Sequence, residues 1–132
     1  MDERGSALPM VMVLIFAGAL IMGLALDLGR WASTWREAAF AADAGATAGA
    51  ATMDVGDAYR GRLRIDTAAA VPAAEQAAIR ARPRAGRGVS VDARRGRVCV
   101  TVRQPFQPSL LRIAGIGDRT VRVQACAAPA QG

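Results

Sequence analysis

Few side chains in this sequence have the types and spacing that chemistry requires. Histidine is absent from all 132 residues, which removes the commonest general base and the commonest metal ligand. Asp27 and Asp43 could be taken for paired carboxylates, but they are sixteen positions apart on one helix, which corresponds to about 24 Å, too far for shared acid–base work. We therefore expect no enzyme, no catalytic or cofactor-binding residue, no metal and no small-molecule substrate.

The two cysteines, Cys99 and Cys126, are too few for a four-thiolate metal centre and are a candidate disulfide. Each lies on the polar side of a predicted strand. If those strands are neighbours with their valine sides inward, both thiols point the same way. The bond would then add about 3–4 kcal/mol to stability. The alternative is two free, buried thiols.

The net charge of +6 does not indicate a nucleic-acid partner. All seventeen basic residues are arginines, and they are dispersed from Arg4 to Arg122 with aspartates between them. No basic stripe carries the interleaved aromatic residues on which single-stranded bases stack. We therefore expect a protein that does not bind nucleic acid.

The elements that must position these residues begin with an apolar segment. No charged residue occurs from Gly5 to Leu26, and twenty helical residues span about 30 Å, the thickness of a bilayer's hydrocarbon core. We predict a cytoplasmic N-terminus at 1–6 and a transmembrane helix at 7–26. A cleaved signal peptide is the alternative, but the apolar stretch is too long, its start is not basic and no A-x-A site follows it.

Polar and aromatic residues mark the predicted exit from the membrane, namely Asp27, Arg30, Trp31 and Trp35. The tryptophans are one helical turn apart, as in an interfacial belt, and Arg30 is expected to pair with Asp27 one turn away. The arginines at the two ends of the span are nearly balanced, so charge does not decide the orientation. A disulfide favours a single-pass protein of the cytoplasmic membrane with its C-terminal domain outside.

Beyond the exit, residues 27–53 continue the helical pattern with many alanines and no proline. One helix from Leu8 to Met53 would be about 70 Å long. Small residues follow one face of its outer half and form a seam that a partner helix could approach closely: Ala38, Ala42, Gly45, Ala46 and Gly49. We expect homo- or hetero-oligomeric packing of this seam against other subunits.

Three stretches, in their order and spacing, resemble a known family: Glu3–Ala7 (ERGSA), Leu26–Arg30 (LDLGR) and Arg36–Ala50 (REAAFAADAGATAGA). They are similar to the N-terminal region of TadE/TadG-like proteins of Flp (tight-adherence) pilus assembly systems. The rest of the chain is similar in outline to members from actinobacteria. The resemblance implies a non-enzymatic, membrane-anchored subunit whose partners are the membrane and other pilus or secretion subunits.

The family's processed pilins are cut after a glycine and carry a glutamate at the fifth mature position. Gly5 offers such a cleavage site here, but the fifth residue after it is Met10, and no acidic residue lies between Gly5 and Asp27. The missing carboxylate argues against cleavage after Gly5. We therefore expect a membrane-resident minor pilin-like component rather than a subunit of the filament shaft.

Residues 54–132 are predicted to form a small extracytoplasmic domain of a helix on an antiparallel sheet, so the fold class is α+β. The helix begins either at an Asp66 or Thr67 cap or at Pro72, and ends near Ala81. A hairpin over residues 89–104 and a last strand over 119–125 supply the sheet. Pro105 is expected to end the second strand, and the apolar 110–116 stretch is expected to cover the sheet.

A second function class stays open beside the assembly subunit. The chain could be an exported or surface-tethered binding module that uses its apolar segment as a cleaved or uncleaved signal anchor. The mature mass distinguishes the two classes, because cleavage of the signal would leave a soluble product that starts near Trp31.

Overall fold

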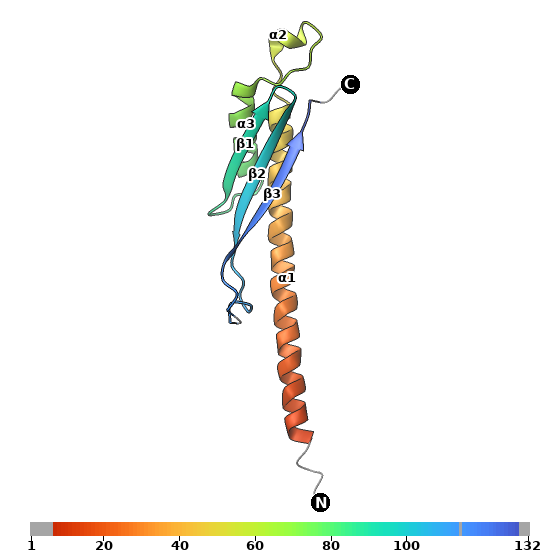
Figure 1. Cartoon of the computed structure of the whole chain (residues 1–132), viewed down its shortest axis with the longest axis vertical. Helices are drawn as coiled ribbons and strands as arrows, with labels where there is room; N and C mark the ends of the chain where they lie inside the picture. Colours follow the sequence, from red (N-terminus) through yellow and green to blue (C-terminus); the bar gives the residue numbers. More distant parts are fainter. Residues whose placement is uncertain (1–6, 114, 130–132) are drawn as a thin grey trace, which may run out of the picture.

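The computed structural model describes residues 7–113 and 115–129, and its longest element is the helix α1 (Ala7–Ala50) (Figure 1). Pro9 lies in the first turn, where its missing N–H costs no helical hydrogen bond. The helix ends three residues before Met53, the predicted end, because Thr52 satisfies the carbonyl of Gly49 with both its amide, at 3.2 Å, and its hydroxyl, at 2.7 Å. α1 is therefore one continuous rod through the predicted membrane exit.

Two shorter helices follow, each with an aspartate at its N-cap. Asp54 caps the single turn α2 (Val55–Ala58), and Asp66 caps α3 (Thr67–Arg80) by accepting the amides of Ala68 and Ala69 at 3.0 and 3.3 Å. Of the possible starts of this helix that the sequence leaves open, the structure has the Asp66 cap. Pro72 lies inside α3, where it removes one backbone donor.

Three antiparallel strands form a sheet in the order β1 (Gly88–Arg94), β2 (Arg97–Phe106) and β3 (Arg119–Ala127). β2 continues through Pro105, which the sequence analysis placed at the end of the strand. The pairing with β1 stops at Arg103, so Pro105 lies where β2 has an open edge, and proline is tolerated at such positions.

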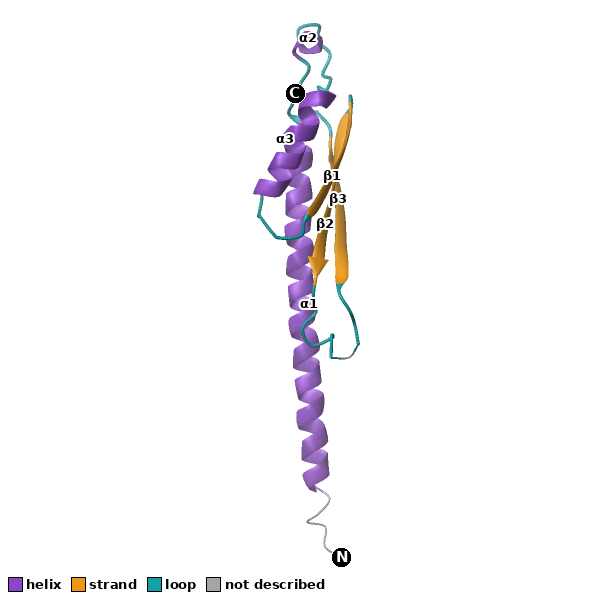
Figure 2. Ribbon diagram, turned by 90° about the vertical axis from the view of Figure 1, so that its left-hand side faces the viewer, coloured by secondary structure: helices purple, strands orange, loops and turns teal. Residues whose placement is uncertain are grey.

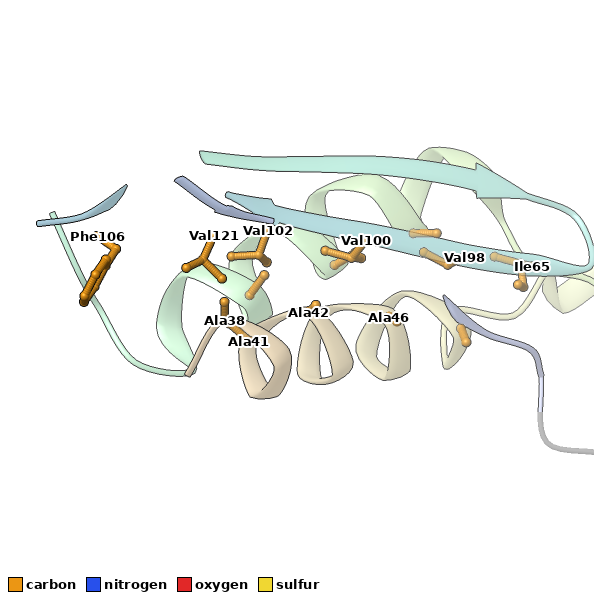
Figure 3. Packing of buried hydrophobic residues seen from close by; sticks show 14 residues of the cluster. Ala38, Ala41, Ala42, Ala46, Ile65, Val98, Val100, Val102, Phe106 and Val121 are labelled. Carbon is orange, nitrogen blue, oxygen red and sulfur yellow. The ribbon is translucent and has the colours of Figure 1, made fainter. Parts of the chain in front are cut away.

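Both long helices pack on one face of the sheet, which makes the expected two-layer α+β fold (Figure 2). The core consists of small side chains: alanines of α1 and α3 face Val98, Val100 and Val102 of β2 (Figure 3). Alanine faces let the backbones approach closely, so a core with few aromatic residues is still filled. The outer part of α1 is thus a structural layer of the folded domain.

A polar network also joins the layers near the end of β2 that contains Gln104. The fully buried Gln104 accepts hydrogen bonds from Arg87, and its amide donates to Glu37 of α1 at 3.3 Å. Glu37 also pairs with Arg84. The network satisfies the one buried amide side chain of β2 and holds the sheet in register with α1.

Candidate functional site: the exit junction on α1

The first half of α1 projects beyond the sheet and packs against little of the chain (Figure 1). Its large apolar side chains are exposed, with Leu8, Phe16 and Ile21 each more than 60% accessible. The helix contains an 18-residue window with a mean hydropathy of 2.5, of which only 6% is buried. Length and composition make this half of α1 able to cross a membrane.

Asp27 lies directly after this apolar half and is 1% exposed. Its carboxylate accepts backbone N–H groups from Ser109, Leu110 and Leu111 at 3.0, 2.8 and 2.7 Å. These three residues belong to the loop between β2 and β3, which extends below the sheet along α1 (Figures 1 and 2). We call Asp27, Arg30 and residues 109–111 the exit junction.

The electrostatics of the junction favour the charged form of Asp27. The hydrogen bond from the Leu111 amide lowers the pKa of this carboxyl most, burial opposes the shift, and the Ser109 and Leu110 amides and nearby Arg30 lower the pKa further. Arg30, the partner expected from sequence, instead donates to the Ser109 hydroxyl. Asp27 and Arg30 thus both bind the loop.

Leu110 packs against α1 one turn before Asp27. A Cβ atom added at Gly23 would lie 2.7 Å from Leu110 Cδ1, so the Leu110 side chain lies directly on the helix backbone and would have to shift if residue 23 had a side chain. The prediction that the 110–116 stretch covers the sheet is therefore wrong: of its described residues, Leu110, Leu111 and Ile113 line a groove with the apolar half of α1. The amides of Leu110 and Leu111 donate to Asp27, which fixes the start of the stretch against α1.

Trp31 and Trp35 lie just beyond Asp27 on α1 and are 47% and 48% exposed. Neither indole is part of the buried core. Both rings are accessible at the level where the sequence places the membrane interface.

The small-residue seam of α1 is occupied by the chain's own elements. Cβ atoms added at Gly45 or Gly49 would come within 2.8–3.0 Å of atoms of α3 or β2. The three alanines of the seam are fully buried, as are Ala70, Ala74 and Ala78 on the facing side of α3. Because α3 and the sheet fill the seam, a helix of another subunit has no access to it.

The predicted disulfide between Cys99 and Cys126 is present. The two residues are directly opposite in the β2–β3 register, on the sheet face away from the helices. The reasoning that valine sides inward would leave both thiols on one side is therefore confirmed.

The sequence identified Asp27 and Arg30 but missed their loop partners. An aspartate next to an apolar span needs a polar partner in any fold. The sequence does not show which one, because the N–H groups that donate to Asp27 lie more than eighty residues away. The candidate cleavage site after Gly5 and the predicted cytoplasmic segment 1–6 lie outside the described residues.

Comparison with protein families matches residues 5–52 to the model "Putative Flp pilus-assembly TadE/G-like". The match covers the whole of α1 and ends two residues after it, so the resemblance is confirmed for the N-terminal segment. No curated protein and no solved structure matches the chain. The family match suggests a component of Flp pilus assembly and points to a structural rather than a catalytic part.

Proposed function

We propose that this chain is a membrane-anchored minor subunit of a Flp/Tad-type pilus or a related secretion assembly. Residues 7–26 span the cytoplasmic membrane, 27–53 continue outside it, and 54–132 form the outer domain. The observation that carries the proposal is that an exposed apolar helix lies within the TadE/G-like segment and continues unbroken into a folded domain.

The disulfide supports an outer location for the domain. Bonds such as Cys99–Cys126 persist in oxidising compartments and are rare in the cytosol. An outer domain with a single span requires the N-terminus to be inside.

The proposed contact with other subunits runs along the apolar half of α1. Because α3 and the sheet fill the outer seam, we assign this contact to residues 7–26, whose large apolar side chains are exposed. Gly18 on this half has open space around it, which permits close approach of a neighbouring helix.

The exit junction disfavours the alternative of a cleaved export signal. Cleavage near Trp31 would remove Asp27 and Arg30 and leave the amides of residues 109–111 without their acceptor. A retained helix keeps the junction intact.

Two measurements test the proposal. In a bacterium that carries this chain and a Flp-type assembly, we expect the intact mass in the membrane fraction and loss of assembled pili on deletion. Complementation with a Gly29→Ala variant should restore the pili, because this position has open space. A soluble product starting near Trp31, or pili unchanged by the deletion, would contradict the proposal.

A further inference from the structure

The loop between β2 and β3 ends in an apolar tip, which we define as Leu110, Leu111, Arg112, Ile113 and Ile116. Ile113 is 82% exposed, and Leu110 and Ile116 are about 40% exposed. The tip and α1 line a shared apolar groove, to which α1 contributes Ala19, Leu20, Gly23 and Leu24. The exposed apolar surface of the tip is thus continuous with that of the helix.

The level of the tip along α1 places it inside the proposed span. The helix residues that it contacts belong to the last two turns of 7–26. Ala19 precedes Asp27 by eight residues, or about 12 Å along the axis. If residues 7–26 cross the bilayer, the tip lies within about the outer 12 Å of the hydrocarbon core, next to the headgroups.

The backbone of the tip is suited to that environment. A non-helical segment can enter a membrane only where its polar backbone groups have partners. The amides of Ser109, Leu110 and Leu111 donate to Asp27. Further along, the amides of Ile113, Gly115 and Ile116 donate to carbonyls within the loop at 3.0–3.1 Å. Six amides in eight residues thus need no water.

We propose that this tip is a second membrane contact, inserted into the outer lipid boundary beside α1. The inference rests on the proposed function, since it requires residues 7–26 to be in the bilayer. The isoleucine and leucine side chains enter the acyl region, while the exposed Arg112 extends its guanidinium to the headgroups. Two contacts, held together by the exit junction, fix the tilt and rotation of the outer domain on the membrane.

Nitroxide accessibility in vesicles tests the insertion. The full chain, with its disulfide intact, is reconstituted in phosphatidylcholine and phosphatidylglycerol, and one added cysteine is labelled in each of three variants. Ile113→Cys reports the tip, Phe16→Cys the span, and Tyr59→Cys, 90% exposed at the far end of the domain, reports water. Collisions with oxygen and with a water-soluble nickel chelate measure depth.

We expect nickel collisions at position 113 to be several-fold fewer than at position 59, with more oxygen collisions, at every lipid-to-protein ratio. Water-like values at 113 with a protected position 16 would overturn the inference and leave the proposed span intact. Water-like values at 16 would instead overturn the span and the inference with it. If position 113 is shielded from the nickel chelate only at low lipid-to-protein ratios, a second copy of the chain covers the tip. That result would also overturn the inference.

Discussion

At the scale of single residues, Asp27 makes the longest-range polar contact described above, between α1 and the loop that joins β2 and β3. It is the only acidic residue of α1 that is buried, whereas Asp43 on the same helix is exposed. Its carboxylate binds three consecutive amides of a loop more than eighty residues away. One charged side chain of α1, next to its apolar half, thus binds the loop that joins β2 and β3.

Asp27→Asn should loosen the loop without unfolding the domain. The amide side chain keeps one oxygen acceptor but loses the charge and the second acceptor, so the three amides are bound more weakly. We expect faster hydrogen exchange at Ser109, Leu110 and Leu111, and little change in the strands. The matched control is Asp43→Asn at the exposed position, which should leave these amides protected. Equal exchange in both variants would contradict this role for Asp27.

The same carboxyl predicts a pH dependence. The loop amides hold the pKa of Asp27 below its usual value, so its stabilising effect is present above the unfolded pKa of about 3.9 and is lost as the pH falls through the lower folded pKa. The difference in Tm between the wild type and Asp27→Asn should be constant near neutral pH and shrink below about pH 4. A difference that does not vary with pH would exclude the ionised carboxylate as its source.

Gly45 tests the close approach of α1 and α3. A methyl group there would lie 2.8 Å from the Ala74 carbonyl oxygen and 3.0 Å from Ala78 Cβ. We expect Gly45→Ala to destabilise the domain by about 1–3 kcal/mol. Gly29→Ala, on the same helix with open space around it, should be neutral or stabilising by up to about 1 kcal/mol. Denaturant unfolding in one detergent compares them, and equal midpoints would contradict the packing.

At the scale of elements, much of the fold follows from local patterns. The alternating valines of β2 predict the buried sheet face, and the alanine run predicts α1 through the membrane exit. The seam of small residues indicates a close contact, but spacing alone cannot distinguish a helix of another subunit from α3. The position of the loop between β2 and β3 was missed because it depends on Asp27 and Gly23, which are distant in sequence and act only in the folded chain.

The disulfide between β2 and β3 is expected to contribute strongly to the stability of the domain. Cys99 and Cys126 are 27 positions apart, and closing a loop of this length stabilises by about 3–4 kcal/mol. For a domain of this size we expect reduction to lower Tm by about 12–24 °C. The Cys99→Ala/Cys126→Ala double variant should start near the reduced value and show no response to reductant. A wild-type Tm that reductant leaves unchanged would contradict the prediction.

At the scale of the whole molecule, α1 has two halves with different surfaces. Its first half exposes apolar side chains, and its second half forms a layer of the α+β domain. Because α1 is one continuous helix that packs on α3 and the sheet, the orientation of its apolar half and that of the domain are linked. A subunit built this way suits an assembly in which packing within the membrane orients domains outside it.

We propose that residues 7–26 remain in the membrane while the domain lies outside it. Labelling of Tyr59→Cys in intact cells with a membrane-impermeant maleimide tests this most directly, because this position is exposed at the end of the domain farthest from the span. The wild type, whose two cysteines are paired, is the unlabelled control. We predict labelling before lysis, with the labelled chain in the membrane fraction. Labelling only after lysis, or a labelled chain released in soluble form, would contradict the account.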